Sequence, residues 1–416
     1  MMSRVFRHAT KAAEWLRNAD KLEVICISGG SRRFFQTSSC QQQHTPLPTH
    51  MNAWQINGYG GNEVFELNKT RVPVMTQADQ VLVKVHAASI NPVDVAMRGG
   101  YGKTILPKLK QISGQSVFPA TLGRDFSGVV VKTGKGVRNF KVGDEVWGIT
   151  SFQHQGSHAE YTLVSTKEIT NKPTTVNHTH AAAVPFVALT TWAAIVTFGG
   201  LTEKNALGKR VLVHAGSGGI GSFAIQLLRV WGAEIVTTCS TDAVGLVKSL
   251  GADYIVDYKT QDVRQELKNI GEFDMVLDTL GGAAQDYSMQ LLKKWKNASY
   301  VTVVSPLLKD TDQYGLLPGL ASAAVSMTTN TFKGLASGQL YHWAFCIPNS
   351  NALRKIGSLI DQQHIRPVID QVFPFHEVPQ AFEKMEGGGA RGKTVIEVIL
   401  CETDRQDEND DTSLDN

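Results

Sequence analysis

The sequence predicts an α/β protein that combines a doubly wound parallel sheet with a mainly antiparallel β domain. Residues 51–185 carry short β-branched runs with glycine at the turns between them, which is typical of antiparallel strands. From about residue 186, short apolar runs alternate with helical patterns, which indicates parallel strands joined by crossover helices. With 416 residues, the chain is long enough for two domains.

The first region contains three clear strand patterns. QVLVKVHAASI (80–90) alternates and is rich in β-branched residues. FSGVVVKTGKGV (126–137) and GDEVWGI (143–149) are strand-and-turn segments. We expect these short strands to pair into an antiparallel, barrel-like domain.

The second region, residues 186–345, follows a strand–helix order. The expected strands are VLVHA (211–215), EIVTTC (234–239), YIVDY (254–258), FDMVLDTLGG (273–282) and SYVTVVS (299–305). The expected helices are residues 220–232, 242–251 and 283–295. A last part, residues 346–400, has a helical pattern at 351–363 and a strand pattern at 393–400, and we expect it to fold back onto the first domain.

The two ends of the chain differ from the rest. Residues 1–50 hold seven Lys or Arg against three Asp or Glu, and their amphipathic pattern and the stretch SRRFFQTSS resemble a mitochondrial transit peptide. We therefore expect a mitochondrial protein of the matrix, with outer-membrane association as the alternative location. The other interpretation of residues 1–50 is a disordered segment without a targeting role. Residues 401–416 hold seven acidic residues and one Arg, and they predict a disordered tail because they offer almost nothing apolar to bury.

Composition argues against several functional classes. The formal net charge of +3 is too small to predict a nucleic-acid partner. The chain has no uninterrupted run of about 18 apolar residues, so we expect no membrane-spanning helix. The five cysteines are widely spaced and form neither a zinc-knuckle nor a disulfide pattern.

A glycine-rich turn predicts a dinucleotide site. Gly216, Gly218 and Gly221 form G-x-G-x-x-G between an expected strand and an expected helix, which is the context that this motif requires. Such glycines permit a tight turn, close approach of the backbone to a pyrophosphate and close packing of helix on strand, while the helix N-terminus offers free N–H groups. The residues between them are expected to contribute as well: Ser217, Gly219 and Ile220.

The residue after the second strand bears on which nucleotide is bound. An acid there would accept from the ribose of NAD and repel a 2′-phosphate, but the chain has Ser240, which can donate to a phosphate. Tyr258, after the third strand, could contact the same group, whereas Asp242 weighs slightly against a phosphate. We therefore predict NADPH rather than NADH. Ser240 could also serve as a helix N-cap, and the two roles are compatible.

The stretch DTLGG (278–282) ends the next strand. Leu280 and Gly281 would then lie at the carboxyl edge of the sheet, where ligands bind in open α/β folds. A plain turn is the alternative.

Several motifs together resemble a known family. They are NPVDVAMRGGYG (91–102), LGRDFSGVVVKTGKGV (122–137), KVGDEVWG (141–148), AVPFVALTTWAAI (183–195), HAGSGGIGSFAIQLLR (214–229) and ARGKTVIEV (390–398). In this order they resemble the medium-chain dehydrogenase/reductase superfamily, and most of all its quinone-oxidoreductase branch. The resemblance covers residues 51–400 and implies a GroES-like catalytic domain beside a Rossmann domain.

The same resemblance bears on metal binding. Zinc-dependent alcohol dehydrogenases of this superfamily carry a cysteine where Asn91 stands and a His-Glu pair where Arg124 and Asp125 stand. Without thiolate or imidazole ligands a tetrahedral zinc site is not expected. His154 and His158 are close in sequence, but no third ligand accompanies them. We expect no metal.

The resemblance implies roles for further residues. Asn91 and Tyr101 would lie in the cleft by the nicotinamide and steady a substrate oxygen, and Thr191 would contact the nicotinamide. Phe345 would lie near the nicotinamide end, and the loop Gly389, Ala390 and Arg391 would close the other side. Structural roles are the alternatives: Asn91 in a turn, Thr191 within a helix, Tyr101 in the core, and Arg391 in an ion pair.

These expectations lead to two functional hypotheses. The first is an NADPH-dependent enzyme that transfers hydride to a quinone or an activated enone without a metal, which the resemblance links to ubiquinone metabolism. The second is an NADPH-binding scaffold that meets a partner such as a membrane protein of the reticulon family. The resemblance also implies a homodimer. Residues 306–342 form an unusually long segment that could be a lid, a membrane-contacting surface or a dimer contact.

Overall fold

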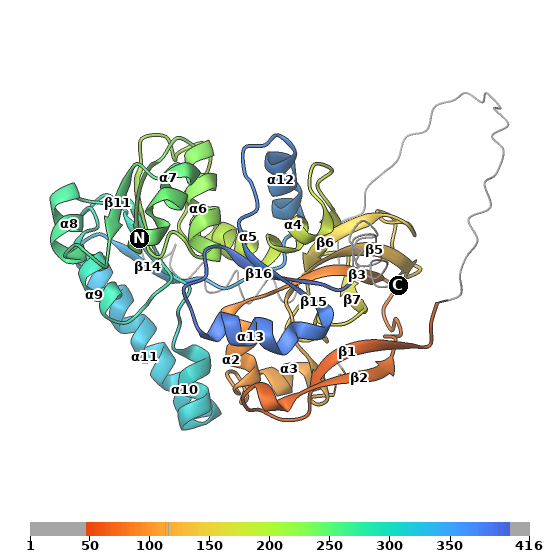
Figure 1. Ribbon diagram of the computed structural model, residues 1–416. Helices are drawn as coiled ribbons and strands as arrows, with labels where there is room; N and C mark the ends of the chain where they lie inside the picture. Colours follow the sequence, from red (N-terminus) through yellow and green to blue (C-terminus); the bar gives the residue numbers. More distant parts are fainter. Residues whose placement is uncertain (1–46, 113, 115, 400–416) are drawn as a thin grey trace, which may run out of the picture. The chain divides into compact units, whose positions relative to one another are not determined.

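The computed structural model describes residues 47–112, 114 and 116–399 of the chain (Figure 1). Nearly all of the predicted leader and the whole acidic tail lie outside these described residues, so both remain predictions. Strand β1 begins at His50, close to the expected start of the first domain.

A parallel sheet of six strands forms one half of the fold, in the order β11-β10-β9-β12-β13-β14. Its strands are β9 (Arg210–Val213), β10 (Glu234–Cys239), β11 (Tyr254–Asp257), β12 (Met275–Asp278), β13 (Ser299–Thr302) and β14 (Leu340–Trp343). The helices that connect them are α6 (Gly219–Val230), α7 (Val244–Leu250), α8 (Val263–Ile270), α9 (Ala283–Gln290), α10 (Leu307–Tyr314) and α11 (Leu316–Leu335), with the 3₁₀ turn η3 (Thr241–Ala243). The strand–helix order predicted from the sequence is confirmed.

Both faces of this sheet are covered, as the continuous apolar strands require. Successive side chains of a strand point to opposite faces. In β9, Val211 and Val213 pack in the core that contains α6, whereas Leu212 packs in a second core with Leu267 of α8. The sheet is therefore doubly wound.

The other half of the fold is mainly antiparallel. A larger sheet runs β15-β16-β3-β5-β6-β8, with β7 also paired to β3, and a smaller one runs β2-β1-β4. Their strands are β1 (His50–Ile56), β2 (Phe65–Arg71), β3 (Gln80–Ile90), β4 (Ala120–Thr121), β5 (Asp125–Thr133), β6 (Glu145–Ile149), β7 (Tyr161–Ser165), β8 (Ile169–Asn171), β15 (Ile369–Pro374) and β16 (Lys393–Glu397). Helices and helical turns of this half are η1 (Asn62–Val64), α2 (Pro92–Arg98), α3 (Leu106–Ile112), α4 (His178–Ala182), η4 (Phe375–Glu377) and α13 (Val378–Glu386). Three further elements, α5 (Pro185–Trp192), η2 (Ala193–Phe198) and α12 (Ser350–Asp361), pack in the core that contains β9 and α6.

The end of the chain returns to this antiparallel sheet. Strand β16 pairs with β3, with Thr394 opposite Ile90. The pairing joins segments about 300 residues apart in sequence, as expected for the fold-back of residues 346–400.

One helical segment bears on the expectation that the chain has no helix able to span a membrane. Residues 178–198, which comprise α4, α5 and η2, are long and apolar enough to cross a membrane, with a mean hydropathy of 1.8. Counting only uninterrupted apolar runs missed this segment because threonines interrupt it. The window is 72% buried inside the protein, and a core helix of a globular fold has the same character.

The long segment 306–342 is mostly helical. It forms α10 and α11 and enters the edge strand β14. Asp312 of α10 accepts hydrogen bonds from the backbone N–H groups of Gly102 (2.6 Å) and Thr104 (2.9 Å). This segment therefore contacts the loop that carries Tyr101.

Candidate active site

The carboxyl ends of the parallel strands gather most of the predicted cofactor residues at one edge of the sheet. The glycine loop follows β9, Ser240 follows β10 and Tyr258 follows β11. Leu280 and Gly281 follow β12, and Phe345 lies two residues after β14. Residues spread over 130 positions thus share one edge because all six strands are parallel.

The glycine loop connects β9 to α6. Gly218 is the N-cap of α6, and Gly219 begins the helix. A Cβ on Gly216 would lie 2.0 Å from Thr237 Oγ1, and one on Gly221 would lie 2.3 Å from the carbonyl oxygen of Ala215. Glycine at these two positions is therefore required by the packing of the protein itself.

Gly218 differs from its neighbours. A Cβ there would meet nothing closer than the Ala215 carbonyl oxygen at 3.4 Å, which is ordinary contact. The fold does not require glycine at this position, yet the residue stands where a helix N-terminus can receive an anion. An open cradle that a side chain would fill fits the pyrophosphate of a dinucleotide.

Ser240 and Arg391 meet at an exposed carboxylate. Ser240 Oγ donates to Asp242, and Arg391 forms an ion pair with the same side chain, which is 56% exposed. Ser240 is also the N-cap residue of η3, but its side chain makes no capping hydrogen bond. Asp242 therefore brings together two predicted cofactor residues that are 151 positions apart in the sequence and occupies the polar groups of both.

The remaining residues of this edge are more open. Tyr258 is 52% exposed, Leu280 is 54% exposed and Phe345 is 42% exposed. Gly281 has a φ of +67°, and its N–H and that of Leu280 donate to Asp278. The DTLGG stretch is thus a turn held by its own aspartate, as the alternative interpretation held, and its role toward a cofactor remains a prediction.

The loop that carries Gly389, Ala390 and Arg391 joins the two halves of the fold. It leads into β16, and Gly392 forms an isolated bridge with Gly218 of the glycine loop. The next residue, Lys393, packs its side chain 3.1 Å from the position of a Cβ on Gly219. The glycine loop and the antiparallel sheet are therefore in direct contact.

Lys393 belongs to a buried polar network that includes Asn91. Its side chain is 5% exposed, and its ammonium donates to Asp125 Oδ2 (3.1 Å), to Asn91 Oδ1 and to the carbonyl oxygen of Ile90 (3.1 Å). Asp125 also accepts from Ser89 Oγ (2.7 Å) and Asn91 Nδ2 (2.8 Å). All three ammonium donors are used, which compensates for burying a charge.

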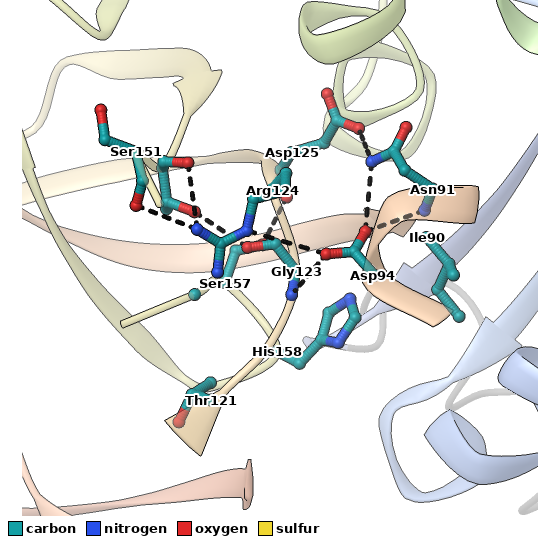
Figure 2. Close-up of polar contacts among 12 residues, drawn as sticks. Ile90, Asn91, Asp94, Thr121, Gly123, Arg124, Asp125, Ser151, Ser157 and His158 are labelled. Carbon is teal, nitrogen blue, oxygen red and sulfur yellow. Dashed lines mark hydrogen bonds and ion pairs between the residues drawn. The ribbon is translucent and has the colours of Figure 1, made fainter. Parts of the chain in front are cut away.

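A second charge pair continues the network, as Figure 2 shows. Asp94 accepts from the backbone and side-chain nitrogens of Asn91 and from the N–H of Gly123, and Arg124 Nε lies 3.7 Å from Asp94 Oδ1. Arg124 also donates to the carbonyl oxygen of Ser151 at 2.9 Å. Two carboxylates and two cations thus balance inside the protein.

Burial dominates the titration of the groups around this network. It lowers the pKa of Arg124, although Asp94 opposes that shift. It also lowers the pKa of His158, whose Nε2 lies 3.3 Å from the Ser89 carbonyl oxygen. His158 is fully buried, and it packs against the ring of Phe382.

The three predicted catalytic residues have different surroundings. Asn91 is 1% exposed with both ends of its amide bonded, so the structure gives it no free polar atom for a substrate. Thr191, in α5, is fully buried, and its hydroxyl has no hydrogen-bond partner among the described residues. Tyr101 is half-buried and lines a hollow beneath α3. Among the described residues, no hydrogen bond joins any two of these three side chains.

Sequence reasoning missed the roles of Lys393, Asp94 and Asp312. Lys393 and Asp312 matter through contacts with distant segments, which no local signal marks, whereas Asp94 forms a local capping box with Asn91 that the N-x-x-D spacing could have indicated. Lys393 was within a quoted motif, but nothing in that motif indicates a buried charge pair. Within the described ranges, no three His, Cys, Asp or Glu side chains are close enough together to hold a metal ion.

Comparisons with known proteins agree with this architecture. Residues 77–174 match the family described as alcohol dehydrogenase GroES-like domain, and residues 250–396 match zinc-binding dehydrogenase. The first range falls on the antiparallel half, and the second covers most of the parallel sheet and the return to β16.

Individual relatives are also similar. The chain is 46% identical over 361 residues to "NAD(P)H oxidoreductase RTN4IP1, mitochondrial" of Homo sapiens, covering 85% of this chain and 91% of that protein. It is 32% identical over 391 residues to "NADPH-dependent alkenal/one oxidoreductase, chloroplastic" of Arabidopsis thaliana, covering 89% and 88%. Similarity to mitochondrial relatives supports a mitochondrial location for this chain.

A solved structure also resembles this fold. The quinone oxidoreductase from Coxiella burnetii is 29% identical, with a TM-score of 0.70 over 84% of this chain and all of that one. Taken with the glycine loop, the two kinds of sheet and the family matches, this likeness shows that the chain is an oxidoreductase and belongs to the medium-chain dehydrogenase/reductase superfamily.

Proposed function

We propose that this protein transfers a hydride from NADPH to a quinone or an activated enone, without a metal ion. The observation that carries the proposal is the open glycine cradle at Gly218, which is bridged to Gly392 and so lies beside the buried Asn91–Lys393 network. A dinucleotide held there would extend from the carboxyl edge of the parallel sheet toward the antiparallel half.

The chain's own residues would bind and orient the cofactor. The N–H groups at the start of α6 would hold the pyrophosphate. Ser240 and Arg391 would hold the 2′-phosphate once Asp242 releases them. Reduced nicotinamide supplies a hydride when bound. Thr191 offers an unpartnered hydroxyl, which fits a polar group of that cofactor if α5 adjusts to expose it.

The buried network would contribute by positioning rather than by proton transfer. Asn91 is held by Asp94, Asp125 and Lys393, so we expect it to stabilise the wall of the site instead of contacting the substrate. A buried set of paired charges gives a rigid, preorganised environment and needs no reorganisation during reaction.

The residues that stand in place of zinc ligands, Asn91, Arg124 and Asp125, bear on the choice of acceptor. An alcohol loses its proton with difficulty at neutral pH unless a metal ion helps. A quinone or enone already has a carbonyl system that accepts hydride. The names of the Coxiella and Arabidopsis proteins, a quinone oxidoreductase and an alkenal/one oxidoreductase, support acceptors of this class.

The test uses the purified full chain with NADPH and tetramethyl-benzoquinone, following the absorbance of the reduced nicotinamide. Gly218→Val should abolish NADPH binding, measured by calorimetry, and turnover. Gly245→Val is the matched control, because a Cβ on Gly245 in α7 meets nothing within 4 Å. Turnover no faster in the wild type than in Gly218→Val would favour the scaffold hypothesis.

The same assay with NADH tests the cofactor preference. A clear advantage for NADPH in kcat/KM is expected from Ser240 and Arg391, and equal efficiency would contradict it. Action in the matrix, a part in ubiquinone metabolism, a reticulon-family partner and a homodimer remain predictions from the sequence.

A further inference from the structure

A hollow lies beneath α3 in the antiparallel half. Its empty volume is about 380 Å³ when the part open to solvent is included. The walls are almost entirely apolar and include Met97, Leu106 and Phe118. Because that volume includes open solvent, the ring of a ligand would lie partly in the open part of the hollow or displace side chains.

One cation lines this apolar hollow. Lys110 of α3 is 6% exposed, and none of the described residues forms a hydrogen bond or ion pair with its ammonium. Most of the side chain is buried among apolar groups, which disfavours the charge, so a ligand that enters the hollow could supply the partner that the protein does not. Lys393, by contrast, has all three of its donors used.

The titratable groups near Lys110 differ in how easily they give up a proton. Burial and the nearby Arg124 lower the pKa of Lys110 to about 8. Burial and the carboxylate of Asp312 raise the pKa of Tyr101 and of Tyr59, which share the hollow. The tyrosines can donate hydrogen bonds but keep their protons near neutral pH, whereas Lys110 can exchange its proton there.

We propose that this hollow is the acceptor pocket of the enzyme and that Lys110 binds and protonates the acceptor's carbonyl oxygen. The proposal rests on the proposed function and names the part of the site that receives the quinone or enone. Apolar walls suit the ring or alkyl part of such a molecule, and a single cation suits the oxygen that becomes negative during reduction.

The step balances without another reactant. Hydride adds to the conjugated carbonyl system and brings two electrons and one hydrogen, so the nicotinamide is oxidised and the acceptor is reduced to an enolate or quinol anion. The Lys110 ammonium then gives its proton to the anionic oxygen and becomes a neutral amine. Water returns a proton to the amine after product leaves.

The loop over this pocket is held from the other half of the fold. Asp312 of α10 binds the backbone of Gly102 and Thr104, and Leu308 lies 3.5 Å from the position of a Cβ on Gly102. Tyr101 and Gly102 are therefore held at the rim by a helix that belongs to the parallel-sheet half.

The experiment compares Lys110→Met with Lys108→Met in the full-length protein. Both remove one lysine charge from α3, but Lys108 is exposed and Lys110 is buried in the hollow. With NADPH and tetramethyl-benzoquinone, Lys110→Met should lower kcat about 100-fold, the usual size of a general-acid effect. The wild-type kcat should fall above about pH 8, where Lys110 loses its proton. That fall should be absent in Lys110→Met and retained in Lys108→Met.

A second measurement does not depend on turnover. An amine-acetylating reagent should modify Lys110 in the wild type, and tetramethyl-benzoquinone should slow that modification while leaving Lys108 unchanged, as read by mass spectrometry. NADPH consumption by Lys110→Met at the wild-type rate and pH profile, or an absence of protection, would overturn the pocket while leaving the proposed function intact. An inactive wild type that still shows protection would count against the proposed function alone.

Discussion

Removing the buried charge of Lys393 is the most direct test of the network that joins the two halves of the fold. Lys393→Met keeps most of the side chain's volume but leaves Asp125 without its cation and Asn91 Oδ1 without its donor. Breaking one side of a buried ion pair costs about 3–5 kcal/mol, because the remaining charge stays buried. We expect a loss of this size in the free energy of unfolding.

The matched control is Lys384→Met. Lys384 also pairs with an aspartate, Asp370, at 3.2 Å, but its side chain is 34% exposed. Solvent screens such a pair, so its loss should cost no more than about 1 kcal/mol. Equilibrium unfolding in urea, followed by circular dichroism and tryptophan fluorescence, measures both variants.

A double variant separates the pair from its surroundings. Combining Lys393→Met with Asp125→Asn removes both charges, so the total loss should be smaller than the sum of the single losses by about 1–3 kcal/mol. If Lys393→Met is no less stable than Lys384→Met, or if the two changes simply add, the network does not hold the halves together as argued.

Three further predictions follow from other parts of the structure. Gly216→Ala should lower stability by about 1–3 kcal/mol in thermal melts because its Cβ would clash with Thr237, whereas Gly218→Ala, which meets no such clash, should cost less, no more than about 1 kcal/mol for the poorer N-cap. Burial lowers the pKa values of His178 and His214 to about 4, below the unfolded value of about 6.5. The stability that these two neutral histidines contribute should therefore be complete above about pH 6.5 and fall toward about pH 4. His178→Gln should flatten that pH dependence of the free energy of unfolding, and an unchanged curve would refute the reasoning. Asp242→Ala should free Ser240 and Arg391 and raise the preference for NADPH over NADH several-fold in kcat/KM, and a fixed ratio would count against their phosphate role.

Much of the fold was predictable because its signals are local. The alternation of apolar runs and helical patterns predicts β9 to β13 and the helices α6, α7 and α9 within a few residues, but it missed α8. Gly251 ends α7 with a left-handed φ of +104°. The expectation of no membrane-spanning helix was incomplete, because a search for uninterrupted apolar runs overlooks residues 178–198.

The candidate site was predictable only in part. Parallel strands bring their carboxyl ends to one edge, so the cofactor residues that follow β9, β10, β11 and β12 could be expected to gather there. Asn91 was expected to face a substrate, but it is buried and its amide is fully bonded. Its partners Asp125 and Lys393 come from positions 34 and 302 residues away, and no spacing in the sequence indicates that contact.

The sequence alone determined the two kinds of sheet, the glycine turn at the start of α6 and the edge at which a nucleotide would bind. These features follow from strand alternation, helix periodicity and turn geometry, which act over a few residues. Tertiary structure alone decided which charges are buried, which of them are paired, and that Lys110 faces an apolar hollow without a partner. The strength of a charge interaction depends on distance and on the surrounding dielectric, and both are set by segments that meet only when the chain is folded.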